Sequence, residues 1–89
     1  MRAIVTVVGK DQVGIIANVC TLLAESGVNI LDISQTILQE YFTMVMLVDA
    51  KESTMPFSEL AQSLKVRGEE QKLSIRVQRE DIFEAMHRI

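Results

Sequence analysis

Hydrophobic positions near the start of the chain form a strand pattern followed by a helix pattern. Residues 3–8 are dense in β-branched side chains without alternation, which predicts a central strand buried on both faces. The glycine-containing segment 9–14 breaks this pattern and predicts a loop. Between Gly14 and Ser26 the apolar period becomes that of an amphipathic helix, and Gly27 stands where a left-handed helix cap is expected. The main apolar stripe of this helix is predicted on Ile16, Val19, Cys20 and Leu23.

Two strands are predicted in the middle of the chain. Residues 28–39 alternate imperfectly, and the phase slip at Ile30 and Leu31 suggests a β-bulge or a strand with apolar contacts on both faces. Residues 41–48 follow a turn at Glu40 and read as the next strand. One face of that strand carries Phe42, Met44, Met46 and Val48. The other face is also apolar, at Val45 and Leu47.

The second half of the chain repeats the order of helix and strand. Pro56 suits the first turn of a helix, and Gly68 is expected to close it. The apolar stripe of this helix falls on Phe57, Leu60, Ala61 and Leu64. Alternation over 73–78 predicts a half-buried strand. Ile82, Phe83, Met86 and Ile89 then predict a short amphipathic C-terminal helix.

The resulting order of elements is β-α-β-β-α-β followed by a short helix. This order is typical of the α+β class with a ferredoxin-like sandwich. We therefore expect a four-stranded antiparallel sheet with both helices on one face, built as a single domain over residues 1–89.

Composition and charge narrow the range of functions. The hydrophobic fraction of 48% argues against disorder. The net charge is −3 and no basic stripe is present, which argues against binding to nucleic acid or to an anionic membrane surface. No apolar run approaches the roughly 20 residues that a membrane span needs, and the first residues do not resemble a signal peptide. A cytoplasmic location is expected.

Few residues are suited to catalysis or metal binding. The one histidine, His87, stands two residues from the end of the sequence, and the one cysteine, Cys20, lies in an apolar helical pattern. No spacing typical of zinc ligands occurs. The acidic pairs at 69–70 and 80–81 are interpreted as solvated surface charges. We therefore expect no catalytic residue, no metal site and no cofactor, so the chain is not expected to be an enzyme.

The loop over 9–14 is the feature that favours a ligand. It joins a predicted strand to a helix N-terminus, where unpaired backbone N–H groups can hold a carboxylate or a phosphate. Gly14 would let a ligand approach the backbone closely. Asp11 suits either of two roles, accepting a hydrogen bond from a ligand ammonium or capping the following helix. The loop matches neither a Walker A motif nor a complete GxGxxG motif.

Residues 9–16 and 22–30 resemble the signature of the ACT family. That signature is an Asp, a Gly three positions later, and an aliphatic helix ending in Gly-x-Asn-Ile. Residues 33–36 and 41–44 are similar to short stand-alone ACT proteins, and to the ACT segments of formyltetrahydrofolate deformylase and of a glycine-cleavage repressor. Val13 departs from the family pattern, because many ACT domains carry Pro there.

The resemblance implies a regulatory module that senses an amino acid or a similar small metabolite. It implies a homodimer joined side by side through the second strand, with the ligand at the seam. The implied ligand-binding residues are Asp11, Gly14 and Ile15 of one chain and Asn29, Ile30 and Leu31 of the other. An alternative is a protein–protein interaction or dimerisation module with no small-molecule ligand, and a separate protein partner also stays open.

The apolar pattern offers independent support for association. The outward-facing Val45 and Leu47 and the two-faced second strand would expose apolar surface in a single chain. A dimer that extends the sheet would bury this surface. Alternatively, Phe83 and Met86 of the C-terminal helix would cover the open sheet face, and both arrangements can hold together.

Overall fold

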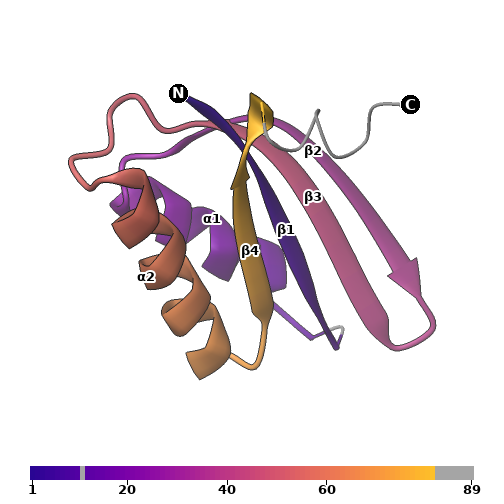
Figure 1. The fold of residues 1–89 in the computed structure, drawn as a ribbon. Helices are drawn as coiled ribbons and strands as arrows, with labels where there is room; N and C mark the ends of the chain where they lie inside the picture. The colour runs from indigo at the N-terminus through magenta and orange to yellow at the C-terminus, as the bar shows by residue number, and fades with distance from the viewer. Residues whose placement is uncertain (11, 82–89) are drawn as a thin grey trace.

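The four strands form one sheet, and two helices pack on one of its faces (Figure 1). The computed structural model describes residues 1–10 and 12–81. The elements are β1 (Arg2–Lys10), α1 (Ile15–Glu25), β2 (Asn29–Leu38), β3 (Tyr41–Asp49), α2 (Phe57–Glu70) and β4 (Ser74–Arg79). The strand order is β2-β3-β1-β4, and every neighbouring pair is antiparallel. The predicted ferredoxin-like fold is confirmed. The predicted C-terminal helix lies at residues 82–89, outside the described part of the chain.

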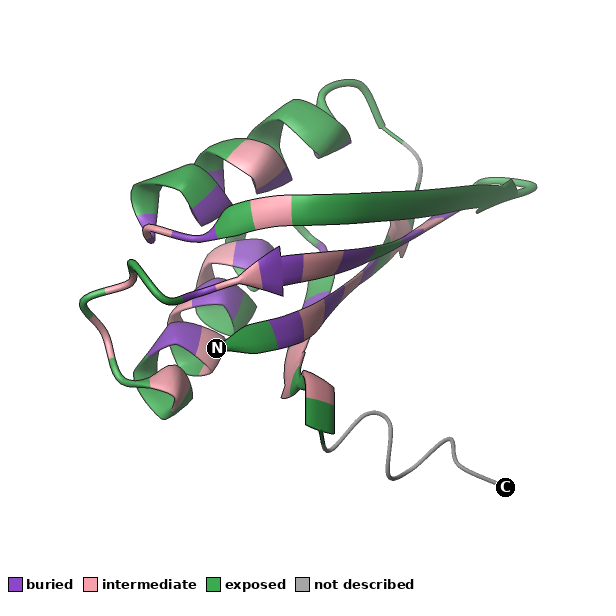
Figure 2. Ribbon diagram, turned by 90° about the horizontal axis from the view of Figure 1, so that it is seen from above, coloured by how far each residue is buried: buried purple, intermediate pink, exposed green. Residues whose placement is uncertain are grey.

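Strand β1 is central, as predicted, but the prediction that both of its faces are buried is wrong. Val5 and Val7 are buried against the helices, whereas Ile4 is only half-buried and Val8 is exposed. Successive side chains of a strand point to opposite faces. Because both helices pack on one face, the other face of β1 is only partly covered by the described residues (Figure 2).

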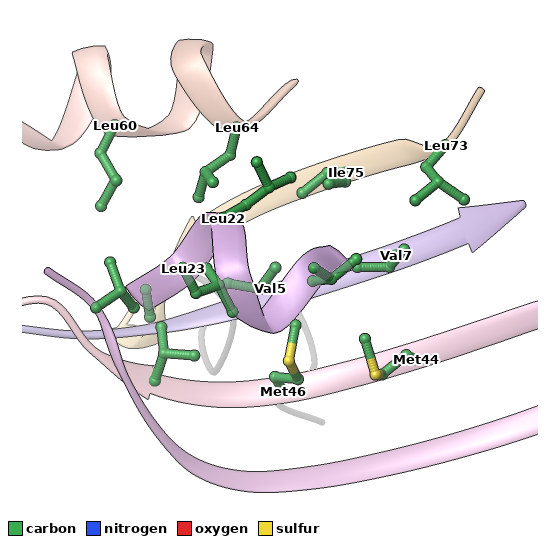
Figure 3. Packing of buried hydrophobic residues seen from close by; sticks show 14 of the residues in the cluster. Val5, Val7, Leu22, Leu23, Met44, Met46, Leu60, Leu64, Leu73 and Ile75 are labelled. Atoms are coloured by element: carbon green, nitrogen blue, oxygen red, sulfur yellow. The ribbon is translucent and has the colours of Figure 1, made fainter. Parts of the chain in front are cut away.

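The core lies between the helices and the covered face of the sheet (Figure 3). Met44 and Met46 of β3 are fully buried there, as are Leu60 and Leu64 of α2. The apolar stripe of α1 is rotated relative to the prediction. Its buried residues are Ile15, Val19, Leu22 and Leu23. The predicted stripe members Ile16 and Cys20 are exposed and half-buried, respectively.

Helix α1 ends in a Schellman motif, which confirms the left-handed cap predicted at Gly27. Gly27 has a φ of 74°, and its N–H donates to the carbonyl of Ala24 at 3.1 Å. The N–H of Val28 donates to the carbonyl of Leu23 at 2.9 Å. These two bonds satisfy carbonyls that the helix end would otherwise leave unpaired.

Helix α2 ends in the same motif, but with a lysine in the left-handed position. Lys72 has a φ of 62°, and its N–H donates to the carbonyl of Glu69 at 3.0 Å. The N–H of Leu73 donates to the carbonyl of Gly68 at 2.9 Å. A left-handed conformation costs a residue with a side chain about 1–2 kcal/mol. The two hydrogen bonds of the motif therefore hold Lys72 in a conformation that is unfavourable for a residue with a side chain.

The prediction that Gly68 closes α2 is wrong, because the helix continues to Glu70. Gly68 is buried inside the helix and faces Ile75 of β4. A Cβ atom at position 68 would lie 2.7 Å from the Ile75 side chain. The glycine therefore serves the close packing of helix on strand rather than the end of the helix.

Candidate functional site

The N-terminus of α1 carries no side-chain cap among the described residues. Its N-cap is Gly14, which has a φ of 84° and therefore needs the conformational freedom of glycine. The first hydrogen bond of the helix runs from the N–H of Asn18 to the carbonyl of Gly14 at 2.9 Å. The N–H groups of the first turn lie ahead of this bond. They are the kind of donors that hold an anion, and the positive end of the helix dipole adds to the attraction.

Space is available beside this helix end. A Cβ atom at Gly14 would have its nearest neighbour at 3.9 Å, the side-chain nitrogen of Asn18. A hollow of about 210 Å³, here called the α1 hollow, lies next to it. The α1 hollow is lined by Gln12, Gly14, Ile15, Ile16, Ala17, Gln35, Ile37 and Phe42. Its walls are mainly aliphatic or aromatic, with amide groups from two glutamines.

The α1 hollow brings together part of the predicted site. Gly14 and Ile15 line it, as expected. Asp11 lies outside the described residues. Asn29, Ile30 and Leu31 stand at the opposite end of β2 and do not line the hollow. Within one chain, therefore, the two halves of the predicted ligand site do not meet.

Sequence reasoning missed the contribution of the hairpin formed by β2 and β3. Gln35 and Ile37 of β2, with Phe42 of β3, form one side of the hollow. A signal for Gln35 was present. Gln35 lies on the same face of β2 as Ile33 and Ile37. Ile33 pairs with Met46, Gln35 with Met44 and Ile37 with Phe42, and these three partners belong to the core. A polar residue in an otherwise apolar row is a reasonable sign of a site lining.

Strand β2 is an edge strand with exposed apolar side chains, and Figure 2 shows it exposed along nearly its whole length. The exposed fractions are 40% for Ile33, 53% for Ile37 and 71% for Leu38. The predicted bulge is confirmed, since the pairing with β3 shifts between Ile30 and Asp32. An apolar edge with open backbone groups is a surface suited to pairing with another strand.

A charged residue of β3, Asp49, pairs in register with Asn29 at the far end of β2. The backbone N–H of Lys51 donates to this carboxylate at 3.0 Å and lowers the pKa of Asp49 below 3.8. The N-terminal ammonium lies 3.3 Å from the same oxygen and acts in the same direction. The end of β2 that holds Asn29 is therefore next to a carboxylate that is ion-paired with the N-terminal ammonium.

Residues 1–10 and 12–81 lack the groupings typical of a metal site or of a membrane span. No group of three or more His, Cys, Asp or Glu residues in that part of the chain is placed to hold a metal ion. No helix there is both long enough and apolar enough to cross a bilayer. Cys20 is a free, half-buried thiol.

Comparison with known proteins adds the family. The family model described as the ACT domain matches residues 2–78. The chain belongs to the ACT domain family. A UPF0237 protein of Clostridium acetobutylicum is 53% identical to this ACT chain over 89 residues, which is 100% of both sequences. These findings confirm the family that the sequence motifs suggested.

Solved structures agree with the fold. An ACT domain protein from Streptococcus pneumoniae has a TM-score of 0.84 and 47% identity, with 98% of each chain covered. A putative glycine cleavage system transcriptional repressor has a TM-score of 0.71 and 26% identity, over 86% of this chain and 44% of that chain. A formyltetrahydrofolate deformylase from Pseudomonas syringae pv. tomato shares the fold, with a TM-score of 0.76 at 22% identity over 88% of this chain and 27% of that chain. ACT domains are a family of regulatory ligand-binding modules.

Proposed function

We propose that this ACT domain is a regulatory module, without catalytic activity, that binds an amino acid or a similar small metabolite between two copies joined along β2. The observation that carries the proposal is the position of the α1 hollow. An uncapped helix N-terminus opens there beside an exposed, apolar edge strand. A volume of about 210 Å³ is below the roughly 300–1,000 Å³ of pockets for drug-sized ligands, which favours a small molecule.

Pairing of two β2 strands would complete the site. In a twofold antiparallel pair centred on the middle of β2, residue 37 of one copy stands opposite residue 30 of the other. Ile37 lines the α1 hollow, and Ile30 belongs to the second half of the predicted site. The dimer would therefore bring Asn29, Ile30 and Leu31 of one copy to the hollow of its mate.

The chemistry of this composite site suits an α-amino acid. The backbone N–H groups of the first turn after Gly14 would donate hydrogen bonds to the carboxylate. The ammonium would donate to side-chain oxygens of Asn29 and Asp11. The aliphatic walls supplied by Ile15 and Ile37 would contact an apolar side chain.

A ligand held by two chains also tightens their association, because binding to the dimer alone shifts the equilibrium toward it. Isothermal titration calorimetry against each of the twenty amino acids, followed by sedimentation velocity with and without the best ligand, tests the proposal. We expect heat for a small subset and a shift toward the dimer. The absence of heat with all twenty at millimolar concentration would contradict amino-acid sensing.

A second candidate function rests on the exposed apolar edge itself. The side chains of Ile33, Ile37 and Leu38 favour strand pairing even without a ligand. The chain would then be a dimerisation or protein-interaction module. A dimer whose dissociation constant is the same with and without every amino acid would favour this candidate over the sensor.

A further inference from the structure

A second hollow lies at the opposite edge of the sheet. A groove of about 690 Å³, here called the β4 groove, runs between α2 and β4. Its residues from α2 are Ser58, Ala61, Gln62, Lys65 and Glu69, which share one flank of the helix. Its residues from the turn and strand are Lys72, Leu73, Ser74, Ile75, Arg76, Val77 and Gln78. The groove is independent of the α1 hollow and of β2.

Strand β4 leaves one side open for pairing. It stands at the end of the strand order and pairs with β1 alone in the described sheet. An edge strand presents backbone N–H and C=O groups on its free side. In an antiparallel edge strand every second residue presents these groups on the free side, so alternate residues of 74–77 would offer them there, next to the flank of α2. A helix beside an open strand edge is the arrangement in which extended peptides bind by strand addition.

The charges of the residues that line the groove indicate that it would bind an acidic peptide. Lys65, Lys72 and Arg76 line it, with Glu69 as the acidic residue among the lining. None of these three cations forms an ion pair with any residue in 1–10 or 12–81. The concentration of unpaired positive charge is notable in a chain whose net charge is −3.

Two arginines on the same elements are already paired, unlike the three cations of the groove. Arg67, on the same helix, lies 2.6 Å from Glu25 of α1. Arg79, at the end of β4, lies 2.8 Å from Asp81. Unpaired cations along a binding groove attract and orient an acidic partner.

We propose that the β4 groove binds an acidic, extended segment of a partner protein as a fifth strand beside β4. Backbone hydrogen bonds to Ser74–Val77 would supply affinity that does not depend on sequence. Alternate side chains of the segment would point into the groove, because the side-chain period of a strand is two. Acidic side chains at those positions would pair with Lys65 and Lys72, and acidic side chains on the opposite face of the segment would pair with Arg76, which shares its face of the sheet with Thr6.

Fluorescence anisotropy with a defined probe tests this proposal. The probe is a fluorescein-labelled hexapeptide in which glutamate and valine alternate, titrated with the full-length chain. We expect saturable binding that weakens at least about tenfold in the double variant Lys65→Glu with Arg76→Glu. The matched control Lys51→Glu reverses an exposed lysine outside the groove and should keep the affinity within about twofold.

A second probe separates strand addition from simple charge attraction. Proline in place of valine keeps the acidic charge but removes the backbone N–H groups that a strand must donate. We expect the proline peptide not to bind measurably. Equal binding of both peptides, or unchanged binding by the double variant, would overturn the proposal.

The occupant is also open to direct test. Amide chemical-shift changes on adding the peptide should concentrate on β4 and the facing flank of α2. Sedimentation velocity of the chain alone should be the same for the double variant and the Lys51→Glu control. A loss of oligomers in the double variant would show that a second copy occupies the groove, and would overturn the assignment of a separate partner.

Discussion

Gly68 of α2 lies so close to Ile75 of β4 that a Cβ atom at position 68 would fall 2.7 Å from both Cγ1 and Cδ1 of the isoleucine. Ile75 is itself buried and cannot swing into solvent. The substitution Gly68→Ala is therefore expected to destabilise the fold by about 1–3 kcal/mol through overpacking. This holds although alanine favours a helix over glycine by about 1 kcal/mol. Urea unfolding measures the difference.

Two further variants test whether overpacking causes the loss of stability. Val66→Ala changes an exposed position two residues earlier in the same helix and should alter stability by no more than about 0.5 kcal/mol. Adding Ile75→Val to Gly68→Ala should recover part of the loss, because the smaller side chain relieves the clash. A gain in stability from Gly68→Ala alone would contradict the packing argument.

The left-handed turn at Lys72 offers a stabilising change. Lys72→Gly should raise the free energy of unfolding by about 1 kcal/mol, because glycine adopts this φ without steric cost. Lys72→Ala removes the same side chain but keeps the left-handed cost, so it should give no comparable gain. Thermal and urea unfolding of both variants check the prediction, and equal gains would contradict it.

Gly27 has the same place at the end of α1 as Lys72 has at the end of α2. Its replacement by a residue with a side chain should lower the free energy of unfolding. Gly27→Ala combines a left-handed φ with a Cβ only 3.0 Å from the carbonyl oxygen of Glu52. We expect a loss of more than about 1 kcal/mol in urea unfolding. A loss of unfolding free energy smaller than the gain from Lys72→Gly would contradict this prediction. It would show that the loop at Glu52 can shift to accommodate the Cβ atom at little cost.

Charge at the N-terminus of α1 should control ligand binding. Gly14→Asp and Gly14→Asn place side chains of nearly equal shape in a left-handed position that both residue types tolerate better than most. Only the aspartate repels a bound carboxylate. We expect Gly14→Asp to weaken binding of the amino acid found by calorimetry at least about tenfold more than Gly14→Asn does. Equal weakening would mean that shape, not charge, decides.

Association along β2 should depend on its apolar side chains. Ile33→Lys places a charge in the middle of the proposed strand pair, where desolvation would be costly. Sedimentation velocity should then show single chains at concentrations where the unchanged protein is dimeric. Val66→Lys alters a similarly exposed residue on α2 and should leave the dimer intact. A dimer that survives Ile33→Lys would exclude this interface.

Asp49 should contribute to the acid sensitivity of the fold. The Lys51 N–H and the N-terminal ammonium hold its pKa below 3.8, so the folded state favours the ionised carboxylate. Its stabilisation is present above that value and is lost as the pH falls through the lower folded pKa. The Asp49→Asn variant should be less stable than the unchanged chain near neutral pH, and the two urea midpoints should converge as the pH falls through the lowered pKa of Asp49. A constant gap across this range would contradict the assignment.

The order of elements was predictable because each change of hydrophobic period is local. The bulge at Ile30 and the cap at Gly27 were also visible locally, as a phase slip and as a glycine after a helical stripe. The role of Gly68 was not, since its contact with Ile75 spans a turn and depends on how α2 lies on β4. A local reading assigns such a glycine to a helix end.

The candidate site was predictable only on its helix side. Gly14 and Ile15 follow from the strand-to-helix junction. Gln35, Ile37 and Phe42 come from a hairpin that the fold places beside that junction, so their proximity depends on sheet order rather than on spacing in the sequence. The half-covered outer face of β1 was likewise decided by where the helices pack.

The strand order has a consequence for valency. Strands β2 and β4 lie at opposite edges of the sheet, so a pair of chains joined through β2 would form one eight-stranded layer with a β4 edge at each extremity. Such a pair would offer two identical β4 grooves, one at each end of the sheet. A partner with two acidic segments, joined by a linker long enough to span the sheet, would bind both β4 grooves at once. A metabolite that promotes pairing of the chains through β2 would thereby raise the avidity for this partner, although it binds far from the β4 grooves.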